Sequence, residues 1–227
     1  MLENLLMFGT VMAGFVIAYA LRNKLRGRLK LLLAFSGAFL LGILFLEIIP
    51  DLFAADYSAR ETGMTLLGGV FFQMFLEYFS RGAEHGHMHI HPNERPSIAL
   101  IIALSIHAFL EGSVVHDGQQ SVLLAILVHK LPIAIIVSSL LLRSTLKLGA
   151  VIAWTVFFAL MSPLGYELTG YLSGAGMDLH THFIMAAATG LMLHVGSTLI
   201  LEASEDHKFT AAKVLVMIGA LVLALLA

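Results

Sequence analysis

The sequence predicts an all-α protein built from eight membrane-spanning helices. Hydrophobic residues make up 59% of the chain and charged residues 12%, whereas a soluble domain carries about a quarter charged residues. Apolar runs of about 20 residues, the length that a helix needs to cross a bilayer, recur along nearly the whole chain. These two observations indicate a single transmembrane domain over residues 1–227.

The hydrophobic runs place the eight spans, and the connections between them are short. The first run is preceded by Glu3 and followed by Arg22 instead of a small-residue cleavage site, so we expect a retained helix and not a signal peptide. Only residues 81–96, rich in Gly, His and Pro, form a loop of any size. The expected spans are 4–21, 30–52, 62–80, 97–115, 121–142, 148–171, 181–203 and 210–226.

The distribution of basic residues predicts the orientation of these spans. If the N-terminus is outside, eleven Lys and Arg residues fall on the cytoplasmic side and only Arg60 falls on the other. Both termini then lie outside, and spans one to three run opposite to spans six to eight. This permits a 3+2+3 arrangement in which two inverted triplets flank a central hairpin of spans four and five.

The central hairpin gathers ionisable residues in the middle of the membrane. His107 and Glu111 are one helical turn apart on one face of span four, and span five carries His129 and Lys130. His107 and His129 each lie eleven residues from Gly118 in the connection, so an antiparallel hairpin brings them to the same depth. A single buried His is more often a packing residue, but four ionisable groups at one depth favour a bound cation.

The chemistry of these side chains limits which cations could bind. The chain has no Cys, so thiolate ligands are excluded, and neutral imidazole with carboxylate suits Zn(II), with Fe, Mn, Co and Cd also compatible. Pro132 has no N–H for the carbonyl of Val128, which predicts a helix kink that leaves an oxygen beside His129.

These motifs resemble those of the ZIP (Zrt/Irt-like protein) family of divalent metal transporters. Span four of that family carries His-Asn-x-Pro-Asp/Glu-Gly, which His107, Glu111 and Gly112 match in part. Span five carries His or Gln, an acidic residue, x, Pro and often Glu, which His129 and Pro132 match. The resemblance implies eight spans with both ends outside and a metal site formed by His107, Glu111 and His129.

The departures from the family pattern bear on the number of metal ions. Some members resemble binuclear carriers, and the residues that would hold a second metal are replaced here by Ala108, Lys130, Ile133 and Ser162. The Lys130 ammonium would lie about where the second cation is expected and could pair with Glu111. We therefore predict a mononuclear site.

Polar residues outside the hairpin suggest parts of a metal pathway. Glu47 and Asp51, at the outer end of span two, are an entrance candidate, although a solvated helix end explains them equally well. His194 and Glu202 in span seven are candidates for an exit path, with interhelical hydrogen bonding as the alternative. We expect His180 and His182 at the surface, with a role as entry ligands as the alternative. The cytoplasmic loop offers weak metal capture or is only a polar linker; its histidines are His85, His87, His89 and His91.

The most consistent function is transport of a divalent transition metal, with zinc the first choice, toward the cytosol. The expected partners are divalent metal ions and the lipid bilayer; a homodimer is compatible with the sequence, and the formal net charge of -2 argues against nucleic acid. No cofactor is expected beyond the transported metal, and the short chain suggests the plasma membrane of a bacterium. The alternatives are a non-transporting metal sensor, a bis-histidine haem protein, and an intramembrane zinc hydrolase, for which the His-Glu-x-x-His pattern is missing.

Overall fold

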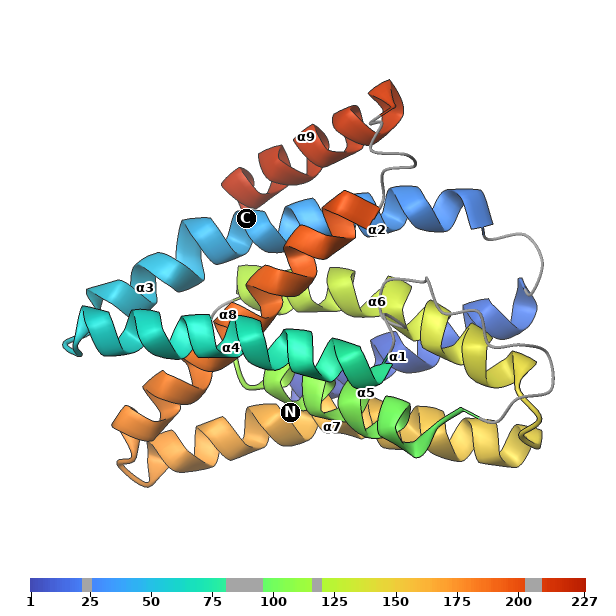
Figure 1. Cartoon of the computed structure of the whole chain (residues 1–227), viewed down its shortest axis with the longest axis horizontal. Coiled ribbons are helices and arrows are strands. Elements are labelled where there is room, and N and C mark those ends of the chain that lie inside the picture. Colours follow the sequence, from blue (N-terminus) through green and yellow to red (C-terminus); the bar gives the residue numbers. More distant parts are fainter. Residues whose placement is uncertain (22–25, 81–95, 116–119, 203–209) are drawn as a thin grey trace.

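The computed structural model describes residues 1–21, 26–80, 96–115, 120–202 and 210–227, and within these ranges all regular structure is helical (Figure 1). Three consecutive elements form one continuous rod, so the described residues make eight rods, as predicted. The largest boundary difference is at the second rod, predicted to start at 30 and observed from Arg26. The elements are α1 (Leu2–Ala20), α2 (Arg26–Ile43), η1 (Leu44–Ile48), α3 (Ile49–Ala54), α4 (Ala59–Ser80), α5 (Ile98–Gly112), α6 (Gln120–Arg143), α7 (Leu148–Gly174), α8 (Asp178–Glu202) and α9 (Ala211–Leu226).

Several of these rods have the length and apolar composition of membrane spans. Five qualify among the described residues, and α5 and α9 are shorter apolar helices. This supports the predicted membrane location, while the 3+2+3 arrangement and the outside location of the termini stay predictions. The five are Leu2–Ala20, Leu29–Ala54, Gln120–Arg143, Leu148–Gly174 and Asp178–Leu201.

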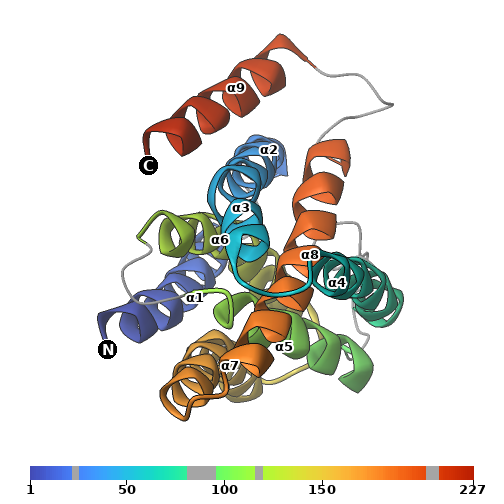
Figure 2. The same cartoon turned by 90° about the vertical axis from the view of Figure 1, so that its left-hand side faces the viewer.

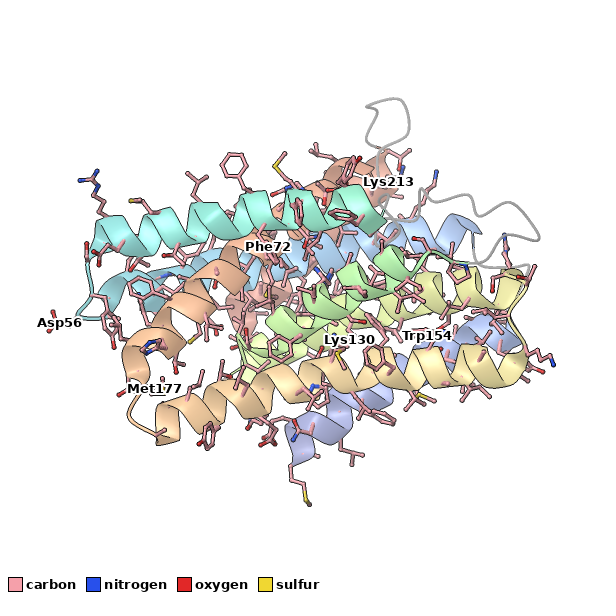
Figure 3. The ribbon with its side chains drawn as sticks, turned by 60° about the horizontal axis from the view of Figure 1, so that its bottom comes forward. Asp56, Phe72, Lys130, Trp154, Met177 and Lys213 are labelled. Carbon is pink, nitrogen blue, oxygen red and sulfur yellow. The ribbon has the colours of Figure 1, made fainter. Side chains whose placement is uncertain are left out.

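The rods lie side by side as a bundle, with α8 crossing the others obliquely and α9 covering α2 on one flank (Figures 1 and 2). The main contacts pair α4 with α8, α1 with α6, and α5 with α7. Asp56, between α3 and α4, and Met177, between α7 and α8, lie at the same end of the molecule, and Lys130 lies in the interior (Figure 3). We call this the Asp56 end; the connection of residues 144–147 is at the opposite end, the Lys147 end (Figure 1).

Glycine allows two pairs of helices to pack backbone against backbone. A Cβ added to Gly112 would overlap the carbonyl oxygen of Ser162, so glycine at this position allows α5 to pack closely against α7. A Cβ added to Gly69 would likewise overlap the carbonyl oxygen of Ala187 and join α4 to α8. A Cβ added to the adjacent Gly68 would meet nothing within 4 Å, so of these two glycines Gly69 is the one that allows close packing.

Proline has different effects in the second rod and in α6. The η1 segment is a π-helix, in which the N–H of Ile49 donates to the carbonyl of Leu44, and it ends at Ile48, two residues before Pro50. Because Pro50 lacks an N–H and its ring crowds the carbonyl four residues earlier, a π turn there relieves the clash; sequence reasoning did not predict it. In α6 the helix continues through Pro132, and the predicted kink beside it stays a prediction.

Candidate metal centre

Two histidines from different helices face one another in the core. His107 of α5 and His129 of α6 are both buried, with ring centroids 6.1 Å apart and ring planes at 63°. A metal that bound one nitrogen of each ring in tetrahedral geometry would hold the centroids about 5.2 Å apart, since metal–nitrogen bonds are about 2.0–2.1 Å, so the rings would have to approach by about 1 Å. The predicted convergence of the two histidines in the hairpin is confirmed, and a metal ion bound between them stays a prediction.

Each imidazole is oriented by a polar neighbour that sequence reasoning did not single out. His107 Nδ1 lies 3.2 Å from Gln73 Oε1 of α4, and His129 Nδ1 lies 3.4 Å from Ser36 Oγ of α2. Because the amide oxygen accepts, His107 donates through Nδ1 and would bind a metal through Nε2, which is buried. Gln73 is fully buried in an apolar span, and that position in the sequence was the available signal.

Glu111 and Lys130 form an ion pair in the same region. Lys130 Nζ lies 2.5 Å from Glu111 Oε2, and each side chain is only 2% exposed. The ammonium also lies 6.0 Å from the centroid of the Phe158 ring. Glu111 Oε1 is buried and accepts no hydrogen bond from the described residues. The pairing of these two residues, predicted from the sequence, is confirmed.

The residues at the expected second-metal positions have other roles in the structure. Ala108 and Ile133 belong to one buried apolar cluster and offer no side-chain ligand. The Ser162 hydroxyl donates to the carbonyl of Ala108 at 2.6 Å, which ties α7 to α5. Together with the ammonium of Lys130, this arrangement gives a second cation no evident ligand set there.

The three predicted ligands do not form a ready-made site in this conformation. Among the described residues, no group of three or more His, Asp or Glu side chains is arranged to hold a metal ion. The two histidines approach one another, but Glu111 is engaged by Lys130. A metal held by all three residues would require Glu111 to leave the ammonium.

The entrance candidates at the Asp56 end have different neighbours. Glu47 accepts a short hydrogen bond from the Ser121 hydroxyl at the start of α6. Asp51 instead lines a pocket of about 300 Å³ together with Tyr57, Asp178 and His182. Their role as an entrance stays a prediction.

The expected surface position of His182 was wrong. Its side chain is buried, its Nε2 lies 2.8 Å from the Thr62 hydroxyl, and its ring centroid is 4.2 Å from that of Tyr57. Packing of α8 on the start of α4 draws this helix-end residue into the core, which no local sequence signal reveals. His180 is exposed, as expected.

Toward the Lys147 end, His194 contacts a residue that sequence reasoning missed. His194 Nε2 lies 2.8 Å from Glu77 Oε2 of α4. Glu202 is the last residue of α8. His85, His87, His89 and His91 lie outside the described residues, so their predicted role in metal capture stays a prediction.

Comparison with known families adds a direct result. The chain matches the family model described as ZIP Zinc transporter over residues 83–227, which is 145 of its 227 residues. The matched segment includes both helices of the hairpin, α5 and α6. No curated protein matches the chain.

Proposed function

Because the chain belongs to the ZIP zinc transporter family, and is therefore a membrane transporter and not an enzyme, we propose that it carries a divalent transition metal through the α5–α6 hairpin. Zinc is the proposed substrate and the cytosol the proposed destination, across the plasma membrane of a bacterium. The family result leaves the hydrolase alternative without support. Apart from the transported metal, the proposal requires no cofactor.

The observation that carries this proposal is the paired histidines. His107 and His129 come from two helices, are buried, and have ring centroids 6.1 Å apart. Buried imidazoles whose Nδ1 atoms contact polar groups are typical of metal ligands that coordinate through Nε2. In the proposed mononuclear site, Glu111 is the third ligand and water completes the coordination shell.

In the proposed site, the Glu111 carboxylate pairs with one of two cations, either the Lys130 ammonium or the metal. In this conformation the ammonium neutralises Glu111. When a metal arrives between the histidines, Glu111 exchanges the ammonium for the metal, and the displaced Lys130 repels a second cation. This supports a mononuclear carrier, and it predicts that Lys130 lowers the apparent affinity for metal because it competes for the same carboxylate.

The test is uptake of radiolabelled zinc into proteoliposomes, with cadmium, manganese and iron as competitors. The variants are His107→Ala, Glu111→Gln and Lys130→Asp, with His180→Ala as a control that removes an exposed histidine away from the hairpin. Each protein is first checked for monodisperse elution in detergent. We expect saturable uptake by the wild type and the control, and none by the first two variants.

Lys130→Asp tests the proposed role of the ammonium. An added carboxylate beside Glu111 should change the order of preference among the four metals, because a harder, more anionic site favours harder cations. Unchanged uptake by His107→Ala would contradict the proposed site. Metal binding by purified protein without uptake under any gradient would contradict transport and favour a sensor.

A further inference from the structure

A second pair of metal-compatible side chains joins α4 to α8 between the central site and the Lys147 end. His194 Nε2 lies 2.8 Å from Glu77 Oε2. The two side chains are 16% and 29% exposed, respectively, unlike the sealed side chains of Glu111 and Lys130. Imidazole and carboxylate are the ligand types offered by the central site, and here both side chains are partly exposed.

The pair is connected to the central site through one helix. Gln73, whose Oε1 contacts His107 Nδ1 at 3.2 Å, precedes Glu77 by one turn of α4. Since α4 starts at the Asp56 end, Glu77 lies about 6 Å farther along the helix toward the Lys147 end. Under the predicted topology, that is the cytoplasmic direction.

The α4–α8 interface fixes the relative positions of the two side chains. Added Cβ atoms at Gly69 of α4 and Gly190 of α8 would each overlap a carbonyl oxygen of the opposite helix. Backbones in such close contact cannot slide past one another without steric clash. Glu77 and His194 are therefore presented to one another by two helices whose backbones are in close contact.

The observed separation is close to that of two ligands on one metal. Bonds of about 2.0–2.1 Å in tetrahedral geometry place two ligand atoms about 3.3 Å apart, so the pair must open by only about half an ångström. Two ligands bind an ion weakly, with water filling the other positions. Weak binding is suited to a site from which an ion must leave quickly.

We propose that Glu77 and His194 form an inner transfer site, which takes the divalent metal from the central site before its release to the cytosol. This inference rests on the proposed transport function. Gln73 lies between the two sites and contacts His107. A purely structural hydrogen bond between α4 and α8 is the alternative that the experiment must exclude.

The first measurement is the number of Co(II) ions bound, read from visible absorption during titration in detergent. It uses the full chain with His85, His87, His89 and His91 replaced by Ser, here called the loop-silenced protein. We expect about two equivalents for this protein, and about one after either His107→Ala or Glu77→Gln. Unchanged binding in Glu77→Gln would overturn the transfer site, whereas unchanged binding in His107→Ala would count against the central site instead.

Two substitutions at Glu77 separate metal transfer from helix packing. Glu77→Gln keeps a hydrogen bond to His194 but removes the carboxylate, and Glu77→His replaces the carboxylate–imidazole pair by two imidazoles that still bind metal. We expect the maximal zinc uptake rate to fall by about tenfold or more in Glu77→Gln, with little change in half-saturating zinc. Glu77→His should restore most of the rate. If Glu77→Gln transports normally, or if Glu77→His is as impaired as Glu77→Gln, the pair is structural and the inference is wrong.

Discussion

Glu111 and Glu77 each contact a basic side chain, and the surroundings of the two carboxylates differ. Glu111 is sealed with Lys130 in the core, each side chain 2% exposed, whereas Glu77 and His194 are 29% and 16% exposed. A buried ion pair depends on both partners because neither can regain hydration, while a partly exposed pair exchanges partners easily. We therefore expect the core pair to contribute more to the stability of this conformation. We expect the α4–α8 pair to exchange its partner for a metal ion more easily.

The largest expected effect comes from breaking the core pair. Lys130→Met leaves the Glu111 carboxylate buried without its cation, which should lower the free energy of unfolding by about 3–5 kcal/mol. Because a bound metal can replace the missing charge, zinc should stabilise Lys130→Met more than it stabilises the wild type. Both quantities follow from unfolding of the purified protein in mixed detergent, with and without zinc.

A double variant provides the control for this prediction. Lys130→Met combined with Glu111→Leu removes both charges and should recover most of the lost stability. Equal zinc stabilisation of the wild type and Lys130→Met would mean that the ammonium does not compete with metal, and the proposed exchange of cations on Glu111 would be wrong.

The region between the two pairs can be tested at Gln73. Gln73→Leu removes the oxygen that orients His107 and should weaken zinc binding at the central site by about 10–100-fold. Gln73→Glu keeps an acceptor oxygen at that position and should retain more of the affinity than Gln73→Leu. Competition with a chromogenic chelator, using the loop-silenced protein, gives both dissociation constants. Equal loss in the two variants would show that packing, and not orientation of His107, accounts for the effect.

The rigidity of the α4–α8 interface is tested by two adjacent glycines. Gly69→Ala places a methyl group on the carbonyl of Ala187 and should cost about 1–3 kcal/mol of unfolding free energy. Gly68→Ala meets nothing within 4 Å, so it should be neutral or stabilising by up to about 1 kcal/mol through helix propensity. Thermal unfolding of the two variants side by side checks this. Similar stability in both would argue against a tightly fixed helix pair.

The two pairs, Glu111–Lys130 and Glu77–His194, also show which features could be predicted from the sequence. The helical rods follow from long apolar runs, and the pairing of Lys130 with Glu111 follows from charge and helix spacing within one hairpin. Those are local properties, or involve two helices joined by a short connection. The roles of Gln73 and Ser36 depend on which distant helix packs against the hairpin, and polar residues in apolar spans do not specify that partner.

Tertiary packing also explains the residues that were misjudged or missed. His182 sits at a helix start, where solvent exposure is the usual outcome, but α4 and Tyr57 cover it. Glu77 is one of several acidic residues near the ends of spans, and its contact with His194 depends on how α4 packs against α8. The π turn before Pro50 reflects how one helix accommodates proline, for which the sequence permits a kink as readily.

The smallest expected effect is on stability at the α4–α8 pair. Glu77→Gln should lower the free energy of unfolding by less than about 1 kcal/mol, because a partly exposed pair gains little from its charges and the amide keeps a hydrogen bond to His194. The measurement is the same unfolding assay used for Lys130→Met, so the two values compare the pairs directly. A cost that approached that of Lys130→Met would remove the distinction between the two pairs and assign Glu77 a structural role. A small cost together with slowed uptake would mean that the carboxylate acts on the ion and not on the fold.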